Sequence, residues 1–307
     1  IETPSAGEQP GNAAQPPPAV AGKLGNLPDL ALPVLWQTGA CGAGNGQFNE
    51  PRGVAVDAEG NVYVADAGNH RIVKLDKAGK FVKAWGSEGE GDGQFLEPFD
   101  VGVAPDGSLV VLDAVQQRLQ RFTPDGQFVA AFGAQNTFYR PRGLWVDGQG
   151  GLWVADTGGI RILKLDQAGQ RLSQIGGRDA PPVGQGQPTD VAVGPGGDIW
   201  VAEATNGILW HLAADGAIVK SIGLNIAGTL DGPHLAAGAD GRLYATEPEG
   251  FRVLVLAADG TPVGQFGMQG NEAGQFRKPL GIAVSAAGQV FVADTPACKV
   301  TAFGAIP

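Results

Sequence analysis

The stretch PRGVAVDAEGNVYVAD, residues 51–66, decides the fold because close copies of it recur along the chain. The copies begin at prolines that lie 43 to 47 residues apart: Pro51, Pro98, Pro141, Pro188, Pro233 and Pro279. Within the first unit, the apolar segments GVAV, VYVA, RIVKL and FVKAWG are separated by short turns such as DAEG and DKAG. Four short strands in a unit of about 45 residues are typical of one propeller blade.

The repeats predict an all-β, six-bladed β-propeller made of four-stranded antiparallel blades. A β-sandwich with coincidental similarity is the alternative, and the regular spacing disfavours it. The last unit ends at KVTAFGAIP without a fourth strand, whereas LPVLWQTG (32–39) precedes the first unit. Gly39 lies 12 residues before Pro51, just as Gly86 lies 12 residues before Pro98. We therefore expect the N-terminal strand to complete the last blade and close the ring.

Composition limits the partners. The formal net charge is -10, the pI is about 4.7, and the chain has no basic run, so we expect no binding to nucleic acid or to an anionic membrane surface. No stretch of 18 apolar residues is present, so we expect no membrane insertion.

Residues 1–31 are rich in Pro and Ala and predict a flexible linker, and we expect residues 32–307 to form the propeller. Because the sequence begins at Ile1, we expect processing or truncation upstream, with a removed signal peptide and a transmembrane anchor as the two alternatives. Of these, we expect a membrane tether.

The two cysteines fall at the predicted ring closure. Cys41 follows the closing strand, and Cys298 lies at the start of the strand that pairs with it. A disulfide between them would join the two ends of the chain and would indicate an oxidising, extracytoplasmic compartment. The alternative is a pair of free thiols.

The segment GAGNGQFNEPRGVAVDAEGNVYVADAGNHRIVKLD (42–76) resembles the NHL-repeat propellers, through its G-Q-F-x-x-P-x-G motif and its V-A-D and N-H-R-I segments. The resemblance implies the propeller fold from about residue 32 to the C-terminus. It does not imply one function, because the family includes RNA readers, protein-interaction modules, sensor domains of receptor-like kinases and a peptidyl-hydroxyglycine lyase.

Each unit carries an acid at the end of its second strand: Asp66, Asp113, Asp156, Glu203, Glu247 and Asp294. Five residues later come Arg71, Arg118, Arg161, Ile208, Arg252 and Lys299. We expect five structural, exposed ion pairs, each contributing about 0–1 kcal/mol. Glu203 faces Ile208 and lacks a base, which makes it the acid most available to a ligand unless Asn206 or solvent satisfies it.

The loops suggest which face binds a ligand. The turns within blades are short on one face, whereas long inter-blade loops such as 86–97 and 177–187 lie on the other, and variable loops on a rigid scaffold commonly carry function. The residues after the blade-opening prolines are Arg52, Phe99, Arg142, Thr189, His234 and Leu280, followed by Gly53, Asp100, Gly143, Asp190, Leu235 and Gly281.

These positions vary while the framework repeats, so they are the candidate ligand-binding residues at the channel mouth: Arg52, Phe99, Asp100, Arg142, Thr189, Asp190 and His234, with Glu203 as a further candidate. Arginine pairs suit a carboxylate or phosphate, and aspartate pairs suit an amine or a cation. The alternative is a solvated mouth that binds only water. Among the aromatic residues, Tyr63, Trp153, Trp200, Tyr244 and Phe291 share one strand position and predict inter-blade packing, and Trp145 is expected to fill a gap between blades.

We predict a non-catalytic, monomeric, extracytoplasmic sensor or accessory domain that binds a protein or a small anionic or saccharide-like ligand on its long-loop face. No cofactor is expected, apart from the alternative of calcium held in the channel by Asp100 and Asp190, as in lactonase-type propellers. The alternative function is a metal-dependent lyase or lactonase-like hydrolase with its site at the channel mouth. A zinc lyase needs clustered histidines, and His70, His211 and His234 are expected to lie apart.

Overall fold

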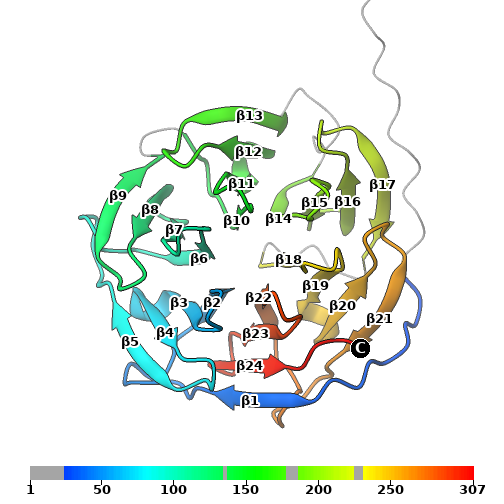
Figure 1. The fold of residues 1–307 in the computed structure, drawn as a ribbon, viewed down its shortest axis with the longest axis horizontal. Coiled ribbons are helices and arrows are strands. Elements are labelled where there is room, and N and C mark those ends of the chain that lie inside the picture. The colour runs from blue at the N-terminus through cyan, green and yellow to red at the C-terminus, as the bar shows by residue number, and fades with distance from the viewer. Residues whose placement is uncertain (1–23, 134–136, 178–185, 225–230) are drawn as a thin grey trace, which may run out of the picture.

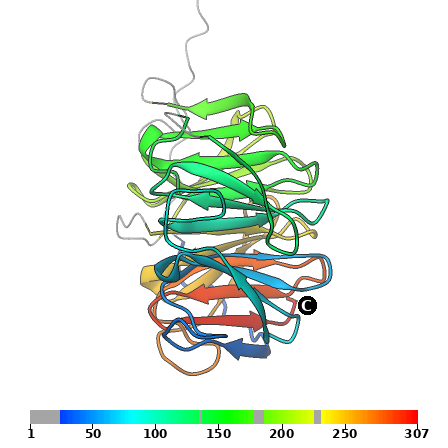
Figure 2. The same cartoon turned by 90° about the vertical axis from the view of Figure 1, so that its left-hand side faces the viewer.

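The computed structural model describes residues 24–133, 137–177, 186–224 and 231–307. Six four-stranded antiparallel sheets surround a central axis, with the first strand of each sheet innermost (Figure 1). Seen from the side, the ring is a disc (Figure 2). The predicted six-bladed all-β propeller is confirmed.

The strand boundaries follow the repeat. Blade 1 contains β2 (Pro51–Val56), β3 (Val62–Asp66), β4 (Arg71–Leu75) and β5 (Phe81–Trp85). Blade 2 contains β6 (Pro98–Val103), β7 (Leu109–Asp113), β8 (Arg118–Phe122) and β9 (Phe128–Phe132). Blade 3 contains β10 (Gly143–Val146), β11 (Leu152–Asp156), β12 (Arg161–Leu165) and β13 (Arg171–Gly176).

Blade 4 contains β14 (Pro188–Val193), β15 (Ile199–Glu203), β16 (Ile208–Leu212) and β17 (Ile218–Gly223). Blade 5 contains β18 (Leu235–Ala237), β19 (Leu243–Glu247), β20 (Arg252–Leu256) and β21 (Pro262–Phe266). Blade 6 contains β22 (Pro279–Val284), β23 (Val290–Asp294) and β24 (Lys299–Phe303). Short 3-10 turns follow the second strands of blades 1, 3 and 5: η1 (Ala67–Asn69), η2 (Thr157–Gly159) and η3 (Pro248–Gly250).

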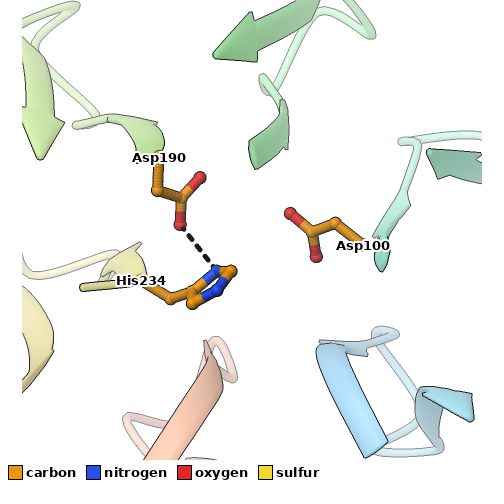
Figure 3. Close-up of side chains that lie close together, drawn as sticks. All are labelled: Asp100, Asp190 and His234. Atoms are coloured by element: carbon orange, nitrogen blue, oxygen red, sulfur yellow. Dashed lines mark ion pairs between the residues drawn. The ribbon is translucent and has the colours of Figure 1, made fainter. Parts of the chain in front are cut away.

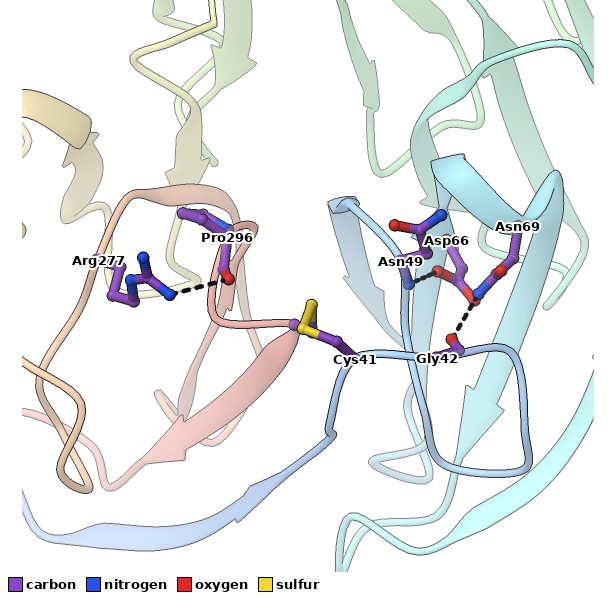
Figure 4. Close-up of a disulfide and its surroundings, with 8 residues drawn as sticks. Cys41, Gly42, Asn49, Asp66, Asn69, Arg277 and Pro296 are labelled. Atoms are coloured by element: carbon purple, nitrogen blue, oxygen red, sulfur yellow. Dashed lines mark hydrogen bonds between the residues drawn. A yellow bond between two sulfur atoms is a disulfide. The ribbon is translucent and has the colours of Figure 1, made fainter.

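The ring closes as predicted. The N-terminal strand β1 (Val34–Thr38) pairs antiparallel with β24, so blade 6 takes its outer strand from the start of the chain (Figure 1). Next to this strand, a disulfide joins Cys41 to Cys298 (Figure 4). The bridge therefore ties the two ends of the ring together. Among the described residues, no helix has the length and apolar character needed to cross a bilayer.

The expected linker, residues 1–31, lies outside the described residues up to residue 23. Its last part does not behave as a linker. Leu24 N donates to the carbonyl of Gly223 at the end of β17, and Leu30 N donates to the carbonyl of Gln265 in β21. Leu24 and Leu30 also pack against the apolar clusters of blades 4 to 6. Ordered packing thus begins before residue 32, because these leucines cover the outer edges of two blades.

The core lies between the blades. Tyr63 of blade 1 is fully buried in one cluster with Phe95, Val101 and Phe122, which belong to blade 2 and to the loop that leads into it. The other aromatic residues at the same strand position are also buried and packed in inter-blade clusters: Trp153, Trp200, Tyr244 and Phe291. The prediction of inter-blade packing is confirmed.

The structural ion pairs expected for the repeated acids are confirmed in three of five blades, but not their exposure. The acids are buried, with exposures of 0–3%, so the pairs are not exposed. Ion pairs form in three blades: Asp66–Arg71, Asp156–Arg161 and Glu247–Arg252. No ion pair forms between Asp113 and Arg118 or between Asp294 and Lys299, all of which lie in the described part of the chain; Arg118 and Lys299 donate to loop carbonyls instead.

Four of the six acids share a contact with the loop that enters their own blade. Asp66 accepts from Asn49 N, Asp113 from Leu96 N and Glu97 N, Asp156 from Tyr139 N, and Asp294 from Arg277 N and Lys278 N. Figure 4 shows the contact between Asp66 and Asn49. In four blades the acid therefore anchors a loop, because a buried carboxylate needs hydrogen-bond donors and the loop supplies backbone N–H groups.

Candidate functional site at the mouth of the central channel

The first strands place one residue from each blade around the channel axis. In blade 4, Ala192 pairs with the aromatic Trp200, and in blade 5, Ala236 pairs with the equivalent Tyr244. The residues two positions earlier, Asp190 and His234, are therefore equivalent. The same rule gives the whole ring: Gly53, Asp100, Gly143, Asp190, His234 and Gly281.

This register corrects the sequence alignment, which placed Leu235 in the ring and His234 beside Arg52 and Phe99. Blade 5 has one residue fewer between its opening proline and its first turn, so His234 moves into the position that holds Asp100 and Asp190 in blades 2 and 4. The peptide bond between Gly232 and Pro233 is cis.

Glycines at the remaining positions make room for the carboxylates. An added Cβ on Gly53 would lie 2.2 Å from Oδ1 of Asp100, and one on Gly143 would lie 2.2 Å from Oδ1 of Asp190. A Cβ on Gly281 would lie 1.9 Å from the carbonyl oxygen of Arg52. Small residues in three blades thus allow side chains from the other three to converge.

Asp100, Asp190 and His234 form a compact buried cluster (Figure 3). Their ligand atoms lie within 4.8 Å of one another, and the residues are only 3–7% exposed. Nδ1 of His234 lies 3.4 Å from Oδ2 of Asp190. The cluster brings together groups from blades 2, 4 and 5.

Backbone N–H groups hold the two carboxylates in place. Oδ1 of Asp100 accepts from Val101 N, and Oδ2 accepts from Leu144 N in the next blade, both at 2.8 Å. Asp190 repeats this arrangement with Val191 N and Leu235 N, again at 2.8 Å. Each carboxylate therefore connects its own blade to the next one by hydrogen bonds.

The residues of the cluster shift one another's pKa values. Burial and the nearby charge of Asp190 raise the pKa of Asp100 to about 7. Burial lowers the pKa of His234, but the carboxylates of Asp190 and Asp100 outweigh burial and leave that pKa above its ordinary value. The group as a whole therefore favours bound positive charge, whether as protons or as another cation.

Above the cluster lies an aromatic and cationic layer. The ring of Phe99 stacks on the His234 ring with a centroid distance of 5.9 Å. The guanidinium carbons of Arg52 and Arg142 lie 4.7 and 5.2 Å from the centre of the same Phe99 ring. Thr189 is buried and donates to the carbonyl oxygens of Pro233 and Ala202, so its role here is structural.

Two residues of the mouth were not identified from the sequence. Asp231 lies 3.7 Å from Arg52 Nη1, 3.3 Å from Arg142 Nη1 and 2.9 Å from Lys278 Nζ. Burial alone would raise the pKa of Asp231, but Lys278 and the two arginines lower it overall. Lys278 directly precedes the blade-opening Pro279, so its place in the repeat is a signal for the channel mouth. Asp231 lies in a non-repeating loop and carries no comparable signal.

Trp145 was expected to fill a gap between two blades, but its side chain lies in the channel. It packs against the clusters of blades 3–4, 4–5 and 5–6, and its Nε1 is buried without a hydrogen-bond partner. The cluster, Trp145 and the apolar side chains of the first strands line a cavity of about 170 Å³. The channel is therefore polar at its mouth and apolar beyond it.

The other candidates lie elsewhere. Glu203 is 1% exposed and accepts hydrogen bonds from Asn206, so the missing base does not leave it available to a ligand. Nδ1 of His70 lies 2.9 Å from the carbonyl oxygen of Leu96, and His211 stacks on Trp200. As expected, the three histidines do not meet. Part of the long loop 177–187, at residues 178–185, lies outside the described residues.

The comparisons agree with this architecture. A family model described as the NHL repeat matches residues 48–75. NHL repeat-containing protein 3 of Mus musculus is 45% identical over 53 residues, which are 17% of this chain and 15% of that protein, so the match spans only a small part of the relative.

Among solved structures, a streptogramin B lyase superposes with a TM-score of 0.63 at 15% identity, covering 90% of this chain and 98% of that one. A gluconolactonase from Xanthomonas campestris superposes with a TM-score of 0.64 at 18% identity, covering 91% of each chain. At these identities the similarity shows the fold alone.

Fold and site together define a six-bladed β-propeller with a polar cluster at one mouth of its channel. Blade 1 matches the NHL repeat at residues 48–75, and units of the same pattern build the other blades, so the chain is a six-bladed propeller that contains an NHL repeat.

Proposed function

We propose that this propeller is a non-catalytic binding domain of an extracytoplasmic compartment, and that its channel mouth takes a small ligand carrying a carboxylate or a phosphate. The single observation that carries the proposal is the convergence of Arg52, Arg142 and Lys278 on the carboxylate of Asp231. The three cations already recognise one carboxylate, and a ligand anion would take the same donors in its place.

The surroundings support a built recognition site. Phe99 is 1% exposed and holds both guanidinium groups against its ring, which limits the freedom that the arginines lose when a ligand binds. The side chain of Asp231 is 36% exposed, more than the side chains of Arg52, Arg142 and Lys278 that surround it. A ligand anion can therefore displace the Asp231 carboxylate toward solvent. The carboxylates of Glu50 and Glu97, 3.9 and 3.4 Å from Arg52, restrict the excess positive charge at this site and favour a small anion over a polyanion.

The proposed compartment rests on the disulfide, since such bridges persist mainly where the environment is oxidising. Within this proposal the chain is the sensor or accessory domain of a larger, membrane-anchored protein.

The test is a thermal-shift screen with citrate, glucuronate, glucose 6-phosphate and inorganic phosphate, followed by calorimetric titration of any hit. We expect the double variant Arg52→Met/Arg142→Met to lose binding and Asp231→Asn, which removes the internal competitor, to bind more tightly. Arg171→Met is the matched control, because Arg171 is exposed at the start of the outer strand β13. The anion proposal fails if no compound binds, or if the control loses binding to the same extent.

A second candidate is a metal-dependent lyase or lactonase-like hydrolase. What favours it is the position of Asp100, Asp190 and His234 beneath the same mouth, with Phe99 between His234 and the arginines. Assays for turnover of gluconolactone and streptogramin B, with and without added Zn²⁺ or Mn²⁺, separate the two functions. If the parent protein turns over either substrate and His234→Gln abolishes that turnover, the non-catalytic proposal is wrong.

A further inference from the structure

We infer that Asp100, Asp190 and His234 bind one divalent cation of the Zn²⁺ or Mn²⁺ type on the axis of the propeller. The inference stands independently of the proposed anion site, because it rests on different residues and on a different kind of ligand.

The first argument is the donor set. Two carboxylates and one imidazole are common ligands of Zn²⁺ and Mn²⁺, and their ligand atoms lie within 4.8 Å of one another. Each oxygen of Asp100 and Asp190 accepts one backbone N–H bond. Both oxygens of Asp100 and Oδ1 of Asp190 keep a second lone pair for a metal, whereas Oδ2 of Asp190 faces Nδ1 of His234. The same N–H bonds fix the carboxylates, as partners of ligating side chains do in metal sites.

The second argument is charge. Two carboxylates at 7% and 3% exposure face each other on the axis, an arrangement that burial makes unfavourable unless a positive charge joins them. A divalent cation would neutralise both carboxylates and leave His234 as a neutral ligand. The charge of Arg52 also acts on His234, and the carboxylates of Glu97 and Asp231 already partner that guanidinium group.

The third argument is space. The ring positions of blades 1, 3 and 6 are glycines, so these three positions place no side chain beside the cluster. The cluster also borders the cavity of about 170 Å³, which can hold water to complete the coordination of a metal. The site would thus have three protein ligands and open positions.

The choice of metal follows from the imidazole. Calcium and magnesium prefer oxygen ligands only, whereas a nitrogen from His234 favours Zn²⁺ or Mn²⁺. This differs from the calcium that the carboxylates alone suggested, and the reason is that the shortened blade 5 brings a histidine into the ring.

The experiment uses tag-free protein treated with EDTA and titrated calorimetrically with ZnCl₂, MnCl₂ and CaCl₂ in buffer without carboxylate or phosphate. We expect one Zn²⁺ or Mn²⁺ per chain and roughly tenfold or more weaker binding of Ca²⁺. His234→Gln and Asp190→Asn should each weaken Zn²⁺ binding roughly tenfold or more. His70→Gln and Asp215→Asn, the latter at an exposed turn, are the matched controls and should bind as the parent protein does.

A second measurement avoids dependence on how well the cluster variants fold. Pulsed electron paramagnetic resonance of the Mn²⁺-loaded parent protein should show coupling to the nitrogen of one imidazole. The inference is overturned if no metal binds below 1 mM, if the controls lose binding like the cluster variants, or if no nitrogen coupling is found. The double variant Arg52→Met/Arg142→Met should keep its metal, so loss of anion binding alone leaves this inference intact.

Discussion

Nδ1 of His234 lies 3.4 Å from Oδ2 of Asp190, although the two residues belong to different blades. The contact exists because blade 5 is one residue shorter before its first turn, which moves the histidine to the position of the aspartates. A one-residue difference in one repeat therefore turns a ring of glycine and aspartate into a mixed cluster, and the cluster has consequences for stability that can be measured.

The first prediction concerns pH. The pKa of Asp100 rises to about 7 from an ordinary 3.8, so the folded protein holds this proton more tightly than the unfolded chain does. Stability is therefore lost as the pH rises from about 4 to about 7. The raised pKa of His234 acts in the same direction, with its stabilisation complete below 6.5 and lost as the pH rises through the folded value.

Asp100→Asn removes one of these two contributions. We expect the loss of unfolding free energy between pH 5 and pH 8 to be smaller in Asp100→Asn than in the parent protein, measured by urea denaturation of metal-free protein at both values. Asp215→Asn, at an exposed turn, should keep the pH dependence of the parent. A variant that loses as much stability as the parent between these pH values would contradict the prediction.

The ring glycines are the subject of the second prediction. A Cβ at residue 143 would lie 2.2 Å from Oδ1 of Asp190 and 2.6 Å from its Cα, so Gly143→Ala forces backbone as well as side chain to move. We expect it to cost about 1–3 kcal/mol of unfolding free energy. Gly148→Ala is the control, since nothing lies within 4 Å of its added Cβ, and it should stay within about 0.5 kcal/mol of the parent.

A third prediction separates loop anchoring from ion pairing. Asp66 and Asp113 are both fully buried and both accept backbone N–H bonds from the entering loop, but only Asp66 has an ion pair. We expect Asp66→Ala and Asp113→Ala to cost about the same, roughly 3 kcal/mol each in urea denaturation. A clearly larger loss in Asp66→Ala would show that the ion pair, and not the loop contact, carries the stabilisation.

The fourth prediction concerns ring closure. Cys41 and Cys298 are separated by 257 residues, so the bridge restricts a very long loop in the unfolded chain. The double variant Cys41→Ser/Cys298→Ser should lose on the order of 4 kcal/mol of unfolding free energy. Titration of the native, unreduced protein with a thiol reagent should find no reactive thiol, and two reactive thiols would disprove the bridge.

Much of the architecture could be predicted because it is repetitive and local. The period of the prolines, the alternation of strands and glycine turns, and the unpaired strands at the two ends were enough to give six blades, the closing strand β1 and the Cys41–Cys298 pair. The candidate site was predicted only in part. Arg52, Phe99, Asp100, Arg142, Asp190 and His234 do gather at the mouth, whereas Thr189 is structural and Glu203 lies away from it.

The sequence by itself determined the blades, because strand periodicity and turn chemistry act over a few residues and recur in every unit. Only the tertiary structure decided which side chains meet, because that depends on the register of strands from different blades and on loops that do not repeat. Positions counted from the blade-opening prolines do not align His234 with Asp190, whereas the strand register does. The repeat also gives no position for Asp231, which lies among Arg52, Arg142 and Lys278. The same holds for Trp145, whose side chain lies in the channel because the ring of blades leaves space there.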